Sequence, residues 1–275
     1  MCDVIKCNDI EDSAQPAISN KQRRDFLAGL VGLPLMTVLA VPEFAKAAAN
    51  NLQNVEIPVG NHKMARGALA LPKGNGKHPT ILLFHEWWGL NDQIKAVAAE
   101  FANQGYIALA VDLYGGQVAT TREEARALTT AFDFDQSLGE IKALADFLGN
   151  HPRSTGKMAT LGWCFGGGVS ISTALAMDVD AAIIYYGRVP QSAQTMKNLR
   201  APVLGHFGTL DKSINREMVD GFQQAATDAG VDHLLELHWY EADHAFANPT
   251  GSRYDDADAA LAFERSLAFL DQNLS

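Results

Sequence analysis

Short apolar runs alternate with longer stretches of helical periodicity along most of this chain. The apolar runs cover residues 80–84, 107–111, 158–161, 181–185, 203–207 and 234–240, and the helical stretches cover residues 93–103, 122–148, 169–177, 216–229 and 256–273. Because parallel strands need a long crossover, usually a helix, this alternation predicts an α/β fold with a mostly parallel central sheet and helices on both faces. Residues 55–59 and 64–71 flank a polar turn and predict an N-terminal antiparallel hairpin.

Within this pattern we expect a single domain over residues 48–275. No internal repeat, low-complexity tract or linker divides that part of the chain. The longest helical stretch carries two signals of its own. Thr120-Thr121 can cap its start, and residues 132–135 are expected to interrupt it.

The segment Gly162-Trp163-Cys164-Phe165-Gly166 follows one of the apolar runs directly. It predicts a nucleophile elbow, in which a strand turns sharply into a helix and the residues flanking the nucleophile must be glycine. The first amides of the following helix would favour a thiolate and, later, an oxyanion. A phosphate-binding loop and a buried packing cysteine are the two alternatives for this segment.

The N-terminus carries an arginine pair at residues 23–24, an apolar stretch at residues 27–41 and small residues at 45–48. This order predicts a twin-arginine export signal over residues 1–47, cleaved near Ala47. A membrane helix is disfavoured, because Pro34 breaks the stretch and its length is below the ~20 residues that a span needs. We therefore expect a periplasmic or otherwise exported protein that uses the twin-arginine export machinery and has no membrane partner after cleavage.

Cysteine content and charge limit the function further. Cys2 and Cys7 lie in the predicted leader, so the exported chain would keep Cys164 alone and could form no intramolecular disulfide. An unpaired thiol in an oxidising compartment is exposed to oxidation, which indicates that it has a use. The formal net charge of −10, without a basic cluster, argues against nucleic acid as a partner.

Two further side chains follow the ends of predicted strands. Asp211 comes after the run 203–207, and His244 comes after the run 234–240. In an open parallel sheet such positions meet at the carboxyl edge, and the order nucleophile, acid, histidine is that of an α/β-hydrolase triad. His244 would then accept the Cys164 proton while a carboxylate orients its ring. Asp211 is the preferred carboxylate, and Asp243 stays open as the alternative.

Residues 85–89 read HEWWG and end the run 80–84. They begin like a zinc-protease motif, but Gly89 stands where the second histidine is needed and the segment leaves a strand, so we predict no metal site. In a hydrolase frame this loop would supply the amide of Trp87 to an oxyanion hole, paired with that of Phe165. Glu86 would lie beside the thiol and share or orient its proton, with a salt bridge or a helix cap as the alternative role.

Together these segments resemble the dienelactone hydrolase family (carboxymethylenebutenolidases) of the α/β-hydrolases. The matching stretches are residues 85–89, 112–114, 162–167 and 185–187, Asp211, and residues 238–246. The resemblance implies a Cys164, Asp211 and His244 triad with Glu86 as the thiol's carboxylate neighbour. It also implies hydrolysis of small esters or lactones through a thioester intermediate, with no metal and no organic cofactor.

The chain departs from this family at two positions. The enzyme that acts on dienelactone has arginines where this chain has Gly116 and Asn248. Because each charge-assisted hydrogen bond is worth ~1.5 to 3 kcal/mol, we expect a different substrate. Arg188 is the candidate replacement cation, or else a solvated loop arginine.

The expected substrate pocket is small and apolar. Its predicted lining residues are Trp88, Tyr114, Arg188, Phe246 and Asn248. The alternative to an enzyme is a protein that keeps this fold but binds a small molecule or a partner without catalysis. Thiol redox chemistry is disfavoured, because no resolving cysteine follows the leader.

Overall fold

The computed structural model describes residues 42–60 and 63–275. The arginine pair at residues 23–24 and the apolar stretch at residues 27–41 lie outside the described residues, so the export signal stays a prediction. The last residues of the expected leader belong to helix α3 (Pro42–Ala49), which spans the expected cleavage position. Ala45 of this helix is buried in the same hydrophobic cluster as Phe101.

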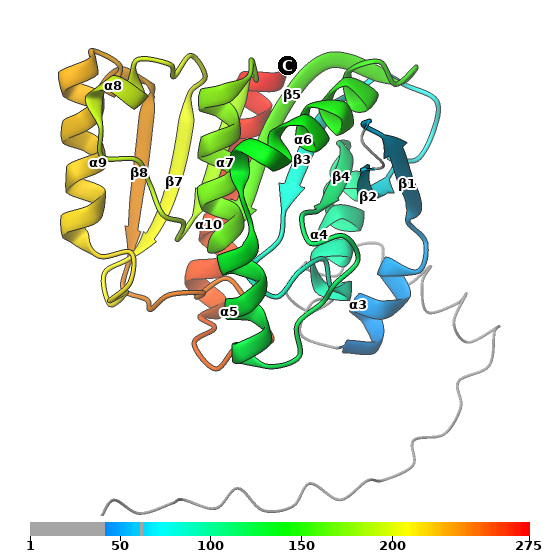
Figure 1. The fold of residues 1–275 in the computed structure, drawn as a ribbon, viewed down its shortest axis with the longest axis horizontal. Helices are drawn as coiled ribbons and strands as arrows, with labels where there is room; N and C mark the ends of the chain where they lie inside the picture. The colour runs from blue at the N-terminus through cyan, green and yellow to red at the C-terminus, as the bar shows by residue number, and fades with distance from the viewer. Residues whose placement is uncertain (1–41, 61–62) are drawn as a thin grey trace, which may run out of the picture. The chain divides into compact units, whose positions relative to one another are not determined.

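Eight strands form one sheet in the order β1-β2-β4-β3-β5-β6-β7-β8 (Figure 1). Their bounds are β1 Gln53–Pro58, β2 Met64–Ala70, β3 His78–Phe84, β4 Ile107–Asp112, β5 Ser154–Trp163, β6 Ala181–Tyr185, β7 Val203–Gly208 and β8 Leu235–Tyr240. Strand β2 is antiparallel to both β1 and β4, and all other neighbours are parallel. The predicted hairpin and parallel sheet are therefore confirmed.

The central strands are apolar on both faces because helices cover both. In β3, Ile81 and Leu83 belong to one hydrophobic cluster, whereas Leu82 and Phe84 belong to another. All four side chains are fully buried. Such continuous apolar runs are typical of parallel strands, whose side chains alternate between two buried faces.

Helices pack on each face of the sheet. Helices α3, α4 (Asp92–Asn103) and α10 (Asp256–Leu274) contribute to the cluster on one face. Helices α6 (Phe134–Gly149), α7 (Phe165–Ala176) and α9 (Arg216–Ala229) contribute to the clusters on the other face, and in Figure 1 α7 lies between α9 and α6. Helix α5 (Arg122–Ala131), helix α8 (Ala193–Met196) and a 3₁₀ helix (Asp232–Leu234) complete the described elements.

The observed helix boundaries confirm one prediction and correct another. The break expected within residues 132–135 is present: α5 ends at Ala131, and the Asp133 side chain caps α6 by accepting a hydrogen bond from the amide of Gln136. Helix α7 was expected to begin at residue 169 but begins at Phe165. Its glycines have low helix propensity, yet their small size lets α7 approach the backbone of β3, and this packing outweighs the propensity.

Candidate active site

Cys164 lies at the junction of β5 and α7 in a strained backbone conformation. Its φ is 54° and its ψ is −115°, a region that residues with a side chain rarely adopt. The amide of Cys164 donates a hydrogen bond to the carbonyl oxygen of Tyr185, which holds the turn against β6. A Cβ atom on Gly162 would collide with the Gly166 carbonyl, and one on Gly166 would collide with the Phe84 carbonyl. The local geometry is that of the predicted elbow.

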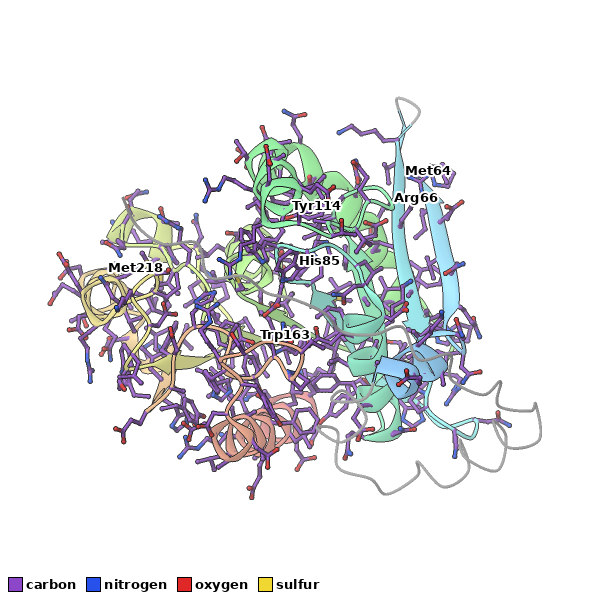
Figure 2. The ribbon with its side chains drawn as sticks, turned by 90° about the horizontal axis from the view of Figure 1, so that it is seen from below. Met64, Arg66, His85, Tyr114, Trp163 and Met218 are labelled. Carbon is purple, nitrogen blue, oxygen red and sulfur yellow. The ribbon has the colours of Figure 1, made fainter. Side chains whose placement is uncertain are left out.

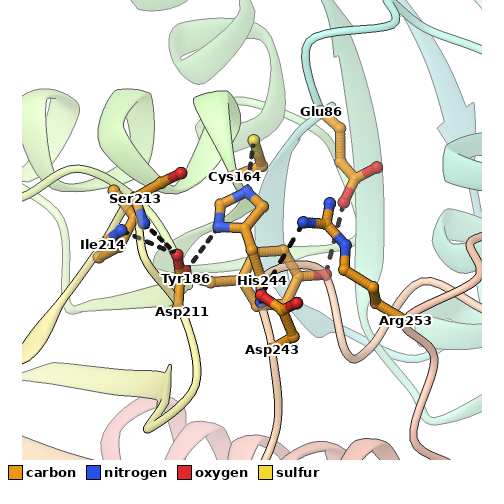
Figure 3. Close-up of polar contacts among 9 residues, drawn as sticks. All are labelled: Glu86, Cys164, Tyr186, Asp211, Ser213, Ile214, Asp243, His244 and Arg253. Carbon is orange, nitrogen blue, oxygen red and sulfur yellow. Dashed lines mark hydrogen bonds and ion pairs between the residues drawn. The ribbon is translucent and has the colours of Figure 1, made fainter. Parts of the chain in front are cut away.

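Three side chains from separate strand ends form a continuous chain of contacts (Figure 3). The Nε2 atom of His244 lies 3.1 Å from the Sγ atom of Cys164, and its Nδ1 atom lies 2.6 Å from the Oδ2 atom of Asp211. The His244 side chain is 14% exposed and that of Asp211 is fully buried. The structure thus brings together the three residues that the sequence analysis grouped.

The contacts of the two candidate carboxylates distinguish them. Asp211 Oδ1 accepts hydrogen bonds from the amides of Ser213 (2.7 Å) and Ile214 (2.9 Å), which leaves Oδ2 for the imidazole. Asp243 instead accepts from the backbone amide of His244 and lies 3.9 Å from an Arg253 nitrogen. Asp211 is therefore the carboxylate that contacts the His244 ring.

The charges within this group favour an ionised histidine. Burial opposes the charge on His244, but the bonds to Asp211 and Cys164 raise its pKa to about 10. Burial likewise acts to raise the pKa of Asp211, yet the hydrogen bonds from His244 and Ile214 hold it below its ordinary value. An imidazolium next to the sulfur stabilises a thiolate, which is the nucleophilic form of cysteine.

Glu86 lies in the loop after β3 and is buried within the same cavity as Cys164. Asn248 Nδ2 donates a 2.6 Å hydrogen bond to Glu86 Oε2, and the Tyr186 hydroxyl donates a longer one, 3.4 Å, to Oε1. Burial raises the pKa of Glu86 above its ordinary value. Its carboxyl oxygens thus contact Asn248 and Tyr186 rather than the thiol, and among the described residues Glu86 makes neither the salt bridge nor the helix cap considered above.

Two residues of the expected oxyanion hole, Trp87 and Phe165, border the same cavity as the sulfur of Cys164. Trp87 is in the turn after β3, Phe165 is the first residue of α7, and both line the cavity together with Cys164. Among the described residues, neither N–H donates a backbone hydrogen bond. Both are therefore free to bind a ligand atom, and their role in an oxyanion hole stays a prediction.

His85 was given no role by the sequence analysis, but it holds this turn in place. Its Nδ1 atom lies 2.6 Å from the carbonyl oxygen of Glu86, and its Nε2 atom accepts the amide of Leu113 at 3.3 Å. Complete burial lowers the pKa of His85 to about 4, so the ring is neutral. It also packs edge-on against Tyr114, with 4.7 Å between ring centroids. Figure 2 labels both residues.

The thiol opens into a cavity of about 930 Å³. Its wall includes Trp88, Phe132, Phe134, Leu175, Arg188 and Asn248. Arg188 is joined there by Arg122 and Arg253, which the sequence analysis missed because nothing in their local sequence marks them. The cavity is much larger than the small pocket that was expected.

Two expected lining residues are absent from this wall. Tyr114 is buried against Phe165, and its hydroxyl lies 3.1 Å from that of Thr129. Phe246 is fully buried between Tyr186 and Tyr240. Both aromatic residues pack in the core next to the site and do not line the cavity, because the loops that carry them turn their rings inward.

Over the residues that the structure describes, no three His, Cys, Asp or Glu side chains are grouped so that they could hold a metal ion. Within the same part of the chain, no helix combines the length and apolar character that a membrane crossing requires.

Comparison with known proteins identifies the family. Residues 65–274 match the model of the dienelactone hydrolase family. The chain belongs to this family. It is 32% identical over 219 residues to a carboxymethylenebutenolidase of Pseudomonas putida, a match that covers 74% of this chain and 90% of that relative. The protein is accordingly a carboxymethylenebutenolidase-like ester or lactone hydrolase that acts on a small molecule.

Solved structures show the same α/β-hydrolase fold. A Klebsiella pneumoniae protein provisionally assigned as a dienelactone hydrolase has a TM-score of 0.72 and 25% identity, and the match covers 81% of this chain and all of that one. A dienelactone hydrolase-like promiscuous phosphotriesterase from metagenomic libraries has a TM-score of 0.74 and 22% identity, covering 82% and 99% of the two chains. Because the phosphotriesterase is only 22% identical to this chain, its likeness concerns the fold alone.

The variants Asp211→Asn and Asp243→Asn test which carboxylate supports the imidazolium. Asp211→Asn removes the partner that keeps His244 charged, so the pH midpoint of the His244 titration, followed by NMR of its ring protons, should fall by about one unit or more from its value of about 10. Asp243→Asn is the matched control and should leave that midpoint in place. Equal shifts in both variants, or a shift in Asp243→Asn alone, would contradict the assignment.

Proposed function

We propose that this protein hydrolyses esters or lactones with Cys164 as the nucleophile, through a thioester intermediate, and that its natural substrate is not dienelactone. The observation that carries the proposal is the pair of contacts at His244, 3.1 Å to the sulfur and 2.6 Å to Asp211. A nucleophile in contact with a base that is itself oriented by a third group is the arrangement that covalent catalysis needs.

The reaction follows from these positions. The Cys164 thiolate attacks the carbonyl carbon, and the carbonyl oxygen takes up the negative charge between the amides of Trp87 and Phe165. The tetrahedral intermediate collapses, the bond to the leaving oxygen breaks, and His244 gives its Nε2 proton to that oxygen. The acyl group is then held as a thioester on Cys164, and in a lactone the released hydroxyl stays on the same molecule.

A water molecule completes the cycle. His244, now neutral, takes a proton from water as the water oxygen attacks the thioester carbon. The second tetrahedral intermediate uses the same two amides and expels the sulfur as a thiolate beside the recharged imidazolium. The carboxylic acid leaves, and the starting ion pair is restored.

Glu86 is proposed to position the loop that carries the Trp87 amide and to tune the charge beside the thiol. Its buried carboxyl is held by Asn248 at 2.6 Å, and its pKa is raised by burial. A neutral Glu86 would disturb the thiolate less than an ionised one, because two like charges in a buried site repel each other.

The substrate part of the proposal rests on the residues that replace the two arginines of the dienelactone enzyme. Gly116 carries no side chain, and the Asn248 amide is used by Glu86. Burial raises the pKa of Glu86, and the positive charge of Arg253 acts to lower it. Arg253, however, lies at a different position of the loop from Asn248. A ligand anion would therefore be bound in another place than in that enzyme.

Export through a twin-arginine signal is proposed for the segment before α3. The arginine pair at residues 23–24 and the apolar stretch after it support this. The full-length protein should accumulate outside the cytoplasm of a bacterium with twin-arginine transport, and replacing Arg23 and Arg24 by Lys should retain it inside. Unchanged fractionation of that variant would contradict the proposal.

The variants Cys164→Ala and Glu86→Gln test the chemistry on a short-chain 4-nitrophenyl ester. Cys164→Ala removes the nucleophile and should lower kcat by about a thousandfold or more. Glu86→Gln keeps the shape of the side chain but turns an NH2 group toward one of the two donors, Asn248 or Tyr186, so the loop should shift and kcat should fall by about tenfold. Wild-type-like turnover by folded Cys164→Ala protein would rule out the thioester route and favour a non-catalytic thiol.

A further inference from the structure

The cavity at the thiol continues along helix α7. Gly168, Ser172 and Leu175 line it at helical spacing, so one face of α7 forms its floor over most of the helix length. Leu175 is the penultimate residue of α7, whereas Cys164 immediately precedes the helix. At a rise of about 1.5 Å per residue, the floor extends roughly 16 Å from the sulfur.

The walls of this channel are apolar. On one side stand Phe132 and Phe134 from the α5–α6 junction, and on the other side stand Val189, Pro190 and Ile214 from the loops after β6 and β7. The two sides belong to different hydrophobic clusters, with α7 between them. Alternating contact of an extended ligand with both sides would remove apolar surface from water along the whole channel.

The cavity is larger than a small lactone requires. A volume of about 930 Å³ lies near the upper end of the ~300 to 1,000 Å³ range of pockets for small organic ligands. The ionisable residues of the lining, apart from Cys164 itself and Tyr186, are Arg122, Arg188, Arg253, His244 and the buried Glu86, and none of them lies on α7. The part of the cavity over α7 is thus suited to a hydrocarbon chain.

We propose that the substrate is an ester with an extended, unbranched apolar acyl chain, which lies along α7 while its carbonyl carbon is at Cys164. This rests on the proposed function, because the chain is placed by the attack of the thiol on the adjoining carbonyl. The channel then sets the chain length that the enzyme prefers, and Ser172, about three-quarters of the way from Cys164 to Leu175, controls access to its far end.

A series of 4-nitrophenyl esters from acetate to dodecanoate tests the chain-length preference. The wild-type kcat/KM should rise by about twofold to fourfold per added methylene up to a medium chain length, and then level off where the channel ends. Ser172→Trp blocks the channel and should reduce the octanoate-to-acetate ratio of kcat/KM by about tenfold or more. Gln223→Trp, on the exposed surface of α9, is the control for an added tryptophan and should keep the wild-type ratio.

Calorimetry of octanoate binding tests the channel independently of hydrolysis. A flat or falling chain-length profile in an active enzyme overturns the channel and leaves the hydrolase standing. If no ester is turned over but octanoate binds to the wild type and not to Ser172→Trp, the channel stands and the hydrolase fails. An unchanged octanoate-to-acetate ratio in folded Ser172→Trp protein, or equal octanoate binding by both proteins, overturns the channel.

A separate contact concerns the oxyanion hole. The carbonyl that His85 contacts at 2.6 Å and the amide of Trp87 belong to the same peptide unit. The His85 Nε2 atom accepts the Leu113 amide, which leaves Nδ1 as the donor to that carbonyl. A hydrogen bond to the oxygen of a peptide fixes its plane and polarises its N–H group.

We infer that His85 is a positioning residue that aims the Trp87 amide at the developing oxyanion, a role that also rests on the proposed function. His85→Leu should lower kcat by about tenfold to hundredfold with little change in KM, because the hole is used in the transition state. His85→Gln can donate to the same carbonyl and should recover much of the loss.

Alkylation of Cys164 by iodoacetamide distinguishes positioning from a general loss of structure. It depends on the thiol and His244, so it should proceed at the wild-type rate in both His85 variants. Loss of alkylation in parallel with turnover, or a Gln variant no better than Leu, would overturn the positioning role. Wild-type kcat in His85→Leu would overturn it as well.

Discussion

The left-handed backbone of Cys164 is the constraint on which the site depends. At a φ of 54°, the chain reverses from β5 into α7 within one residue, and the thiol is left at the carboxyl edge of the sheet. The reversal is possible because Gly162 and Gly166 allow backbone atoms to approach where any Cβ would collide. The same close approach places the amide of Phe165 beside the sulfur. The tight turn therefore both strains the backbone of Cys164 and positions the groups of the site.

Buried charge is the second organising element. Asp211 is buried, and His244 and Cys164 are partly buried, which makes each ionised group costly by itself. The backbone amides of Ser213 and Ile214 stabilise the carboxylate, the carboxylate stabilises the imidazolium, and the imidazolium contacts the sulfur of Cys164. Glu86 does not belong to this series of contacts, because Asn248 and Tyr186 bind its carboxyl group. Burial favours its neutral form.

The sequence predicted the strands, the parallel sheet and the positions of the three linked side chains, because periodicity and strand ends are local signals. It preferred Asp211 but left Asp243 open, since the choice depends on which side chain the loop turns toward the ring. It placed Tyr114 and Phe246 in the pocket, although both rings pack in the core. The channel over α7 and the contact between His85 and Leu113 join residues distant in sequence, for which one chain gives no signal.

The central claim is that the acyl group passes through the sulfur of Cys164. Mass spectrometry of the protein, quenched in acid within milliseconds of mixing with a slowly deacylating 4-nitrophenyl ester, tests it most directly. The account predicts one added acyl group, located on the peptide that contains Cys164 and removed by hydroxylamine. An acyl group on another residue, or full turnover with no acylated protein at any time, would contradict it.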